Sequence, residues 1–142
     1  MVKQISVFIE NKHGSMKEVL NILAENNINI DALSVADTTE FGVARMIVSN
    51  PELAQKVLSD EGIIVRVSKI TAVAVADEPG ALMKTFSILE DNNIAIEYMY
   101  AFGEKINGSS VIAIRTDNRE LAGECLKNGG VKVLEQSDIE DL

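Results

Sequence analysis

The stretch DEPGALMKTFSILEDNNIAIEYMYAF, residues 77–102, decides the fold of this chain, because a second version of it, NKHGSMKEVLNILAENNINIDALSVA, occupies residues 11–36, 66 positions earlier. Seven of the 26 aligned positions are identical: Gly14/Gly80, Ile22/Ile88, Leu23/Leu89, Asn26/Asn92, Asn27/Asn93, Ile28/Ile94 and Ile30/Ile96. Several other positions keep the same kind of residue, such as Leu20 and Phe86. A repeat at a fixed spacing predicts two copies of one structural unit.

Each copy has the pattern of a strand, a tight turn and a helix. An apolar run comes first, at residues 5–9 and again at residues 73–76, and a turn with a glycine follows it. Apolar residues then recur at i, i+3, i+4 and i+7 from Met16 to Leu23, and the second copy keeps this stripe. That spacing predicts a helix with one buried face. An asparagine pair ends each helix, because Asn tolerates the left-handed conformation, and the isoleucines after it favour a strand.

The repeat resumes at an offset of 68 after loops of different length. GVARMIVSNPELAQKVLSDEG, residues 42–62, aligns with SSVIAIRTDNRELAGECLKNGG, residues 109–130. Each segment predicts a strand and then a second helix, which begins at an asparagine N-cap, Asn50 or Asn118. Pro51 fits the first helical position because the missing N–H has no helical partner there. Last strands are predicted at residues 63–67 and 131–134.

These segments predict an α+β fold of two ferredoxin-like βαββαβ units, residues 1–70 and residues 71–142. In this arrangement a four-stranded antiparallel sheet carries both helices on one face. We expect the two units to lie side by side, so that one can extend the sheet of the other. A single unit of about 70 residues buries only enough surface for a marginally stable core, whereas the 142-residue pair is long enough to bury a stable one.

Composition limits the function classes. The chain is 46% hydrophobic and 25% charged, and it contains no run approaching the roughly 18 apolar residues of a membrane span. The start of the chain lacks a signal-peptide pattern, so we expect a cytoplasmic location. The net charge is −9 and the basic residues are scattered, which argues against a nucleic-acid partner. The acidic C-terminal residues are expected to form a solvated, frayed tail: Glu135, Asp138, Glu140 and Asp141.

Candidate catalytic groups are few. His13 is the one histidine, and the second copy has Pro79 at its position. No Ser, Cys and carboxylate spacing makes His13 part of a triad, and neither His13 with Cys125 nor the carboxylates have the spacing of a metal site. We therefore expect no catalytic residue, no metal, no cofactor and no enzymatic activity.

The two glycine turns, residues 11–14 and 77–80, are the candidate binding sites. Each lacks the spacing of a phosphate-binding loop. Each does place a glycine directly before a helix, where free N–H groups and the positive end of the helix dipole can hold a carboxylate. The structural alternative is that the glycine only permits the turn, while Asn11 or Asp77 caps the helix.

The second glycine turn and the strand beyond its helix carry a family resemblance. Asp77-Glu78-Pro79-Gly80-Ala81-Leu82 and Asn93-Ile94-Ala95-Ile96-Glu97-Tyr98 resemble the motifs of the ACT domain, a small-molecule-sensing module of amino-acid metabolism. The first copy is a looser match, and the resemblance covers nearly the whole chain. It implies an amino acid bound at interfaces between ACT units, where the turn supplies main-chain groups. Carried over by position, the ligand-binding residues are Asn11, His13, Gly14, Ser15, Met16, Asp77, Pro79, Gly80, Ala81 and Leu82.

Asn29 joins this set through a further resemblance. The serine-sensing ACT domain of phosphoglycerate dehydrogenase has asparagines at the positions of Asn11 and Asn29, whereas the second copy has Asp77 and Ala95 there. The histidine that this family has two residues before the first asparagine is Ile9 in this chain. We therefore expect two sites that are not equivalent, and the identity of the amino acid stays open.

An aromatic stripe is the candidate dimer surface. Tyr98 and Tyr100 alternate along a predicted strand, and Ile96 and Phe102 extend the stripe. The helices are expected to cover the other face of the sheet, so an exposed stripe would need a partner. We expect a homodimer through these four residues. Packing inside the chain and direct contact with the ligand are the alternatives.

Two functions fit these expectations. The first is a non-catalytic amino-acid sensor, in which a small amino acid bound between ACT units changes their arrangement and a partner enzyme or regulator of amino-acid metabolism responds. The second is a regulatory or structural subunit of an amino-acid biosynthetic enzyme, which acts by protein contact.

Overall fold

The computed structural model describes residues 1–10, 14–37 and 41–140. It divides the chain into two compact units: the first unit is Lys3–Ser68, and the second unit is Lys69–Leu142 together with Met1 and Val2. Each is the α+β, ferredoxin-like unit that the repeat predicts. The expected boundary after residue 70 falls inside a strand, β4, which continues from the first unit into the second.

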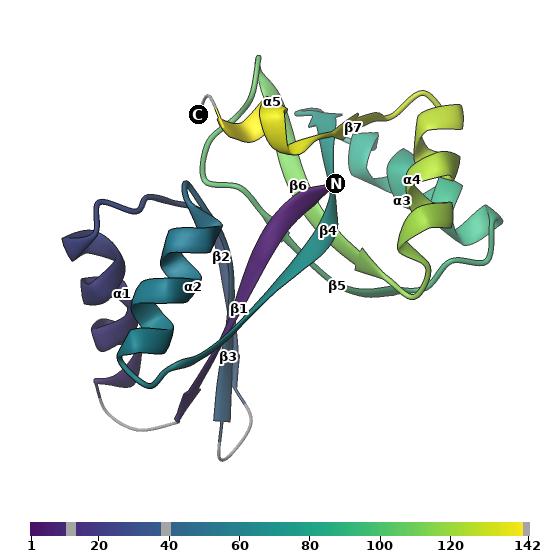
Figure 1. Ribbon diagram of the computed structural model, residues 1–142. Coiled ribbons are helices and arrows are strands. Elements are labelled where there is room, and N and C mark those ends of the chain that lie inside the picture. Colours follow the sequence, from purple (N-terminus) through teal and green to yellow (C-terminus); the bar gives the residue numbers. More distant parts are fainter. Residues whose placement is uncertain (11–13, 38–40, 141–142) are drawn as a thin grey trace. The chain divides into compact units, whose positions relative to one another are not determined.

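The first unit contains two helices and a sheet in the strand order β2-β3-β1-β4. Strand β3 pairs antiparallel with both of its neighbours, and Ile5 is paired with Met46 in the β1–β3 register. Helices α1 and α2 lie on the same side of these strands (Figure 1). The element bounds are β1 (Val2–Glu10), α1 (Ser15–Glu25), β2 (Ile30–Asp37), β3 (Phe41–Val48), α2 (Pro51–Asp60) and β4 (Ile64–Ala76).

The second unit repeats this arrangement in the strand order β5-β6-β4-β7. All three pairings are antiparallel, and Val73 of β4 is paired with both Ile112 and Val133. Helices α3 and α4 lie together on one side of the strands (Figure 1). The bounds are α3 (Ala81–Asp91), β5 (Ile96–Ala101), β6 (Ser109–Thr116), α4 (Arg119–Asn128), β7 (Lys132–Leu134) and α5 (Gln136–Glu140).

Each unit has its own core between its sheet and its helices. In the first unit Val7, Met46 and Leu23 are at most 1% exposed and belong to one apolar cluster. In the second unit Val73 and Leu89 take the corresponding places. Burial of such side chains contributes roughly 1.5–3 kcal/mol each, so the two cores hold the helices and the turns before them in place.

The helix ends follow the predicted signals. The side chain of Asn50 accepts a hydrogen bond from the backbone N–H of Leu53 at 3.1 Å, and Asn118 accepts one from Leu121 at 3.2 Å. After α1 and α3, Asn27 and Asn93 both have a φ of 56°, the left-handed conformation. The predicted N-caps and helix ends are therefore confirmed.

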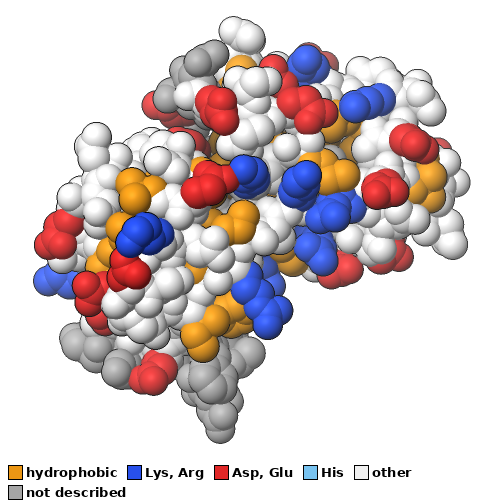
Figure 2. Space-filling model, viewed as in Figure 1, with side chains coloured by type: hydrophobic (Ala, Val, Ile, Leu, Met, Phe, Trp, Pro, Cys, Tyr) orange, Lys and Arg blue, Asp and Glu red, His pale blue; other side chains and the backbone are white. Residues whose placement is uncertain are grey.

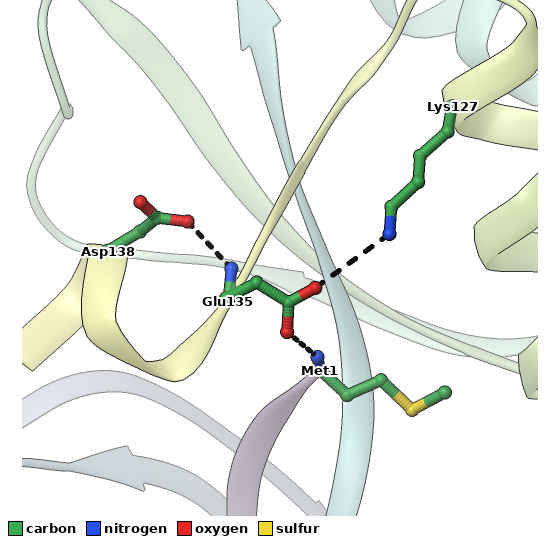
Figure 3. Close-up of polar contacts among 4 residues, drawn as sticks. All are labelled: Met1, Lys127, Glu135 and Asp138. Carbon is green, nitrogen blue, oxygen red and sulfur yellow. Dashed lines mark hydrogen bonds and ion pairs between the residues drawn. The ribbon is translucent and has the colours of Figure 1, made fainter.

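The C-terminal tail is not frayed, which corrects the prediction for residues 135–140. Residues Gln136–Glu140 form helix α5, and Ile139 on it is only 3% exposed. Asp138 accepts a hydrogen bond from the backbone N–H of Glu135 at 2.7 Å, which is half of a capping box (Figure 3). Asp141 lies outside the described residues. One buried isoleucine and one cap are enough to order a helix this short against the rest of the unit.

Glu135 also joins the two ends of the second unit. Its carboxylate accepts a hydrogen bond from the amino group of Met1, and Nζ of Lys127 lies 3.8 Å from its other oxygen (Figure 3). The hydrogen bond from the amino group lowers the pKa of Glu135, and the positive charges of that group and of Lys127 add to the effect.

The aromatic stripe differs from its prediction at Ile96. The register shifts between Ile96 and Tyr98, so that Ile96 is opposite Thr116 while Tyr98 is opposite Arg115. Because neighbouring residues of a strand point to opposite faces, this bulge moves Ile96 to the helix side, where it packs against the core. The prediction that Ile96 extends the tyrosine stripe is therefore wrong.

The remaining aromatic residues of the stripe are largely covered within one chain. Tyr100 and Phe102 are 7% and 8% exposed, and Tyr98 is half-buried. The rings of Tyr98 and Tyr100 stack with centroids 6.5 Å apart. The exposed aromatic surface that motivated a dimer at these residues is therefore absent from this part of the described chain, and packing inside the chain, the alternative, accounts for Tyr100 and Phe102.

Candidate functional site

The glycine directly before the first helix of each unit has the same backbone conformation in both units. Gly14 is the N-cap of α1 with φ 88°, and Gly80 is the N-cap of α3 with φ 88°. An L-residue avoids this left-handed region because its Cβ approaches the following carbonyl oxygen. Glycine therefore adopts this conformation at the start of each helix without the strain that another residue would have.

Among the described residues, no side chain caps either of these two helices. The alternative interpretation, that Asp77 caps α3, is wrong: the Asp77 carboxylate instead accepts a hydrogen bond from Nζ of Lys105. Asn11 and His13 lie outside the described residues. The N–H of Ala81, the first residue of α3, donates to the backbone carbonyl of Glu78 at 3.3 Å. The other N–H groups of the first turns of α1 and α3 have no partner inside a helix and receive no side-chain oxygen from the described chain, so they can meet a ligand.

A cavity of about 300 Å³ adjoins the turn of the second unit, and we call it the second cavity. Of the predicted residues it brings together Asp77, Pro79 and Leu82. Ser110 and Ile112 of β6 also line it. These two residues line the cavity because β6 pairs with β4, and Ser110 is directly opposite Val75, two residues before Asp77.

The first unit has a cavity of similar size, which we call the first cavity. Ser15, the first residue of α1, lines it and is 8% exposed. The carboxylate residues Glu10, Glu18 and Glu61 also line it, and the aromatic ring of Phe8 borders it. The first cavity therefore has three acidic residues in its wall, whereas the second cavity has two, Asp77 and Glu78.

Three predicted residues are at least partly structural. Met16, Ala81 and Leu82 are half-buried and pack against the cores of their units. Leu82 also lines the second cavity, whereas Met16 does not line the first. Their apolar side chains hold the first turn of each helix against the core, which fixes the direction of the N–H groups in that turn.

Asn29 is not brought to the turn of its own unit. It follows the C-terminal end of α1, and Gly14 precedes the N-terminal end. The 11 residues of α1 span about 16 Å at 1.5 Å per residue, which is too far for both to contact one amino acid. The side-chain amide of Asn29 donates to Asp31 at 3.0 Å, and its backbone N–H donates to Ser49 at 2.9 Å.

The cavity walls formed by other strands and loops were not predicted from the sequence. Ser110 and Ile112 come from β6, and residues 61–64 come from the segment after α2. Lys105, which donates a hydrogen bond to Asp77, comes from the loop between β5 and β6. Only strand pairing brings these segments to the turns. The one available signal was the longer loop of the second copy, which contains Lys105.

Metal and membrane contacts find no support among residues 1–10, 14–37 and 41–140. No three His, Cys, Asp or Glu side chains in these ranges are grouped so that they could hold a metal ion. No helix in them is both long and apolar enough to cross a bilayer. On the face drawn in Figure 2, hydrophobic side chains lie in small groups among charged ones.

The comparisons with known proteins agree with this architecture. The sequence matches the ACT domain pair family over residues 1–142. Among solved structures, protein BT0572 from Bacteroides thetaiotaomicron is 38% identical, with a TM-score of 0.91, and the match covers 99% of this chain and 96% of that one. No protein with a curated description matches the chain.

A more distant similarity is to the ligand-free regulatory subunit of aspartate kinase from Thermus thermophilus. It is 18% identical, with a TM-score of 0.61, and the match covers 89% of this chain and 91% of that one. At this identity the likeness shows a shared fold. From the family match and the 38% identical structure, the chain belongs to the ACT-domain family, as a pair of the regulatory modules that typically bind amino acids.

Proposed function

We propose that this chain is a non-catalytic amino-acid sensor whose binding sites are the two glycine turns. The observation that carries the proposal is the pair of helix N-termini at Gly14 and Gly80, which no side chain of the described residues caps and which each adjoin a cavity of about 300 Å³. The α-carboxylate of the ligand would accept hydrogen bonds from N–H groups in the first turn of α1 or α3 that have no partner inside the helix, where the helix dipole favours a negative charge.

The second cavity supplies a partner for the ammonium group. Asp77 lines it and is exposed, so an ammonium group can reach the carboxylate without crossing the core. Leu82 and Ile112 give it an apolar wall. Charge-assisted hydrogen bonds at both ends of a zwitterion are stronger than neutral ones, so this arrangement favours an α-amino acid over a neutral molecule.

The first cavity offers the same chemistry with different residues. Glu10, Glu18 and Glu61 provide negative charge for an ammonium group, and Ser15 stands at the helix N-terminus. Because the acidic residues of the two cavities differ in number and position, we propose that the units differ in affinity. Both volumes are at the lower end of the roughly 300–1,000 Å³ typical of ligand pockets, which favours a small amino acid.

The response is proposed to pass to a partner. A ligand shifts a conformational equilibrium only by its difference in affinity between two states, typically about 1–3 kcal/mol. We propose that ligand bound between ACT units favours one arrangement of those units, which an enzyme or regulator of amino-acid metabolism then reads. The solved structure of an aspartate kinase regulatory subunit has this fold and is named as a subunit of an enzyme.

We also propose a homodimer, through a different surface from the tyrosine stripe. Leu33 and Val35 on β2 are 41% and 46% exposed, and Leu20 on α1 is 37% exposed. Leu33 and Val35 are opposite Met46 and Ala44, which belong to the core under the helices, so the two side chains are on the helix side of the sheet.

A second copy of the chain is the proposed occupant of this surface. Strand β2 is at the end of the strand order, so it carries backbone groups that can pair with another strand. The β2 strands of two chains can pair about a twofold axis. In that arrangement the apolar patch of one chain contacts the same patch of the other chain.

The test of the proposal is binding of amino acids to variants of the turns. Gly14→Val and Gly80→Val place a branched side chain at each helix N-terminus, and each should abolish binding at its own site. Asp77→Ala should weaken binding at the second site alone, without a change of backbone. Circular dichroism checks that each variant is folded, and full affinity in all three variants would contradict the proposal.

A further inference from the structure

The loop between β5 and β6 brings a positive charge to Asp77, a residue that lines the second cavity. Nζ of Lys105 donates a hydrogen bond to Oδ2 of Asp77, and the two residues are 28 positions apart in the chain. Asp77 is the acidic residue that would bind a ligand's ammonium group under the proposed function. The Lys105 ammonium therefore already bonds one oxygen of the carboxylate that this group of the ligand would need.

Hydrogen bonds on both sides of Lys105 fix its backbone. Before it, the N–H of Phe102 donates to the carbonyl of Val111 at 2.9 Å. After it, Ile106 and Ser109 exchange two backbone hydrogen bonds of 3.0 and 2.9 Å. The turn between them, Asn107-Gly108, has φ angles of 50° and 79°, the left-handed pair typical of a tight type I′ hairpin.

Only residues 103–105 are left between these two anchored points. The backbone pairing that builds β6 also places this short segment at the same end of the sheet as Asp77, because Ser109 is opposite Ala76. The geometry of the hairpin therefore brings Lys105 close to Asp77, because the short segment that contains Lys105 is held at both ends.

The first copy has no equivalent of this cation in its sequence. The corresponding segment, residues 37–41, reads DTTEF and contains neither lysine nor arginine. It is also two residues shorter than the seven residues 103–109. The longer loop of the second copy is therefore the part that brings a lysine to the turn.

We propose that the ammonium group of Lys105 competes with the ammonium group of the amino acid for the carboxylate of Asp77. This competition lowers the affinity of the second site for its ligand, compared with the same site without Lys105. The inference rests on the proposed function, since it concerns the same site. A ligand must first separate Lys105 from Asp77, so its apparent affinity is reduced by the fraction of molecules in which the pair is open. Exposed ion pairs are weak, which predicts an affinity about two- to sixfold higher when Lys105 is removed.

The sign of the change separates competition from the other roles that a lysine can have here. If Lys105 bound the carboxylate of the ligand, its removal would lower affinity. If it acted only through its charge, any nearby lysine would have a similar effect. Competition alone predicts a gain in affinity that depends on the amino group of the ligand.

The experiment is a site-resolved titration of the full chain. Each of the twenty amino acids is added alone to ¹⁵N-labelled protein, and the amide resonances of Gly14 and Gly80 report the two sites separately. The amino acid that shifts Gly80 is then titrated into wild type, into Lys105→Met, which keeps most of the aliphatic stem, and into the control Lys84→Met. Lys84 is an exposed lysine near the start of α3, so its removal changes the charge of the same unit equally.

Lys105→Met should lower the dissociation constant at Gly80 by about two- to sixfold and leave that at Gly14 unchanged. The same amino acid without its amino group should bind wild type and Lys105→Met equally. An unchanged or higher dissociation constant at Gly80, or an equal gain in Lys84→Met, would overturn the inference while the proposed function stands. No shift at either glycine with any amino acid would overturn the proposed function and this inference with it.

Discussion

Gly14 and Gly80 have almost the same backbone conformation, with ψ angles of −9° and −12° at the same φ of 88°, although 66 residues separate them. Both stand between a strand and a helix whose N-terminus is capped by no side chain of the described residues. The repeat in the sequence is thus a repeat of one local geometry, and that geometry is the basis of the proposed binding sites.

This conformation predicts a specific cost for adding a side chain. Gly14→Ala and Gly80→Ala should each lower the free energy of unfolding by about 1 kcal/mol, because an L-residue is strained at a positive φ even where space is open. Gly123→Ala is the control: Gly123 is inside α4, without a positive φ and with open space, so alanine should stabilise by about 0.5–1 kcal/mol. Urea unfolding measures all three, and equal effects would contradict the assignment.

A buried hydroxyl gives the second prediction. The Oγ1 atom of Thr116 is buried without a hydrogen-bond partner among the described residues, at the position where the first unit has Val48. Thr116→Val should raise the free energy of unfolding by about 1 kcal/mol, because an unsatisfied buried polar group is costly.

Thr85→Val is the matched control for Thr116→Val. Thr85 is 2% exposed, but its hydroxyl donates to the carbonyl of Ala81 at 3.2 Å. Removing a satisfied hydroxyl should bring no comparable gain. A stabilisation of both variants, or of neither, in urea unfolding would show that the missing partner of Thr116 does not matter.

The pair of Lys3 and Glu52 gives a prediction about pH. The hydrogen bond from Lys3 lowers the pKa of Glu52 below its ordinary value of 4.5. A carboxylate with a lowered pKa in the folded state contributes stability above its unfolded pKa, and loses it as the pH falls through the folded pKa. Lys3→Met should thus bring the ¹³C-detected pKa of Glu52 up toward 4.5.

The same variant should differ from wild type in stability near neutral pH and converge with it below the folded pKa of Glu52. The difference should be small, because the pair is exposed and screened by solvent. A Glu52 titration that is identical in wild type and Lys3→Met would rule out the hydrogen bond as the cause of the shift.

The proposed dimer surface predicts a change in molar mass. Leu33→Lys combined with Val35→Lys should halve the mass seen by light scattering, because charges on an edge strand oppose pairing between chains. Ile64→Lys is the control, since Ile64 is 66% exposed on another strand and should not affect the mass. A double variant with the wild-type mass would exclude this edge as the interface.

The parts of the fold that the sequence predicted are those with local causes. The asparagine caps and the left-handed ends at Asn27 and Asn93 depend on neighbours within a few residues, and the structure confirms them. The apolar stripe of α1 is buried at Val19 and Leu23, but Leu20 on it is 37% exposed. Strand β4 was only partly predicted: residues 63–67 and 73–76 were expected to be separate strands, but Ile64–Ala76 is continuous. That continuity depends on pairing with strands far away in the chain.

The same reasoning explains the other differences. The bulge after Ile96 is a shift of register between β5 and β6. A shift of one residue moves a side chain to the other face of the sheet, and this shift moves Ile96 away from the face of Tyr98. Helix α5 is short and weakly periodic, so its order depends on where Ile139 is buried. The contact between Lys105 and Asp77 joins segments 28 residues apart, which no local pattern reveals.

The most direct test of the central claim is a thermal-unfolding scan of the purified chain with each of the twenty amino acids at millimolar concentration. A ligand at about 100 times its dissociation constant stabilises by roughly 2.7 kcal/mol, which is several degrees for a chain of 142 residues. We predict a rise for one chemical class of amino acid, lost in Gly14→Val combined with Gly80→Val. A melting temperature that no amino acid changes would contradict the claim that these turns are amino-acid sites.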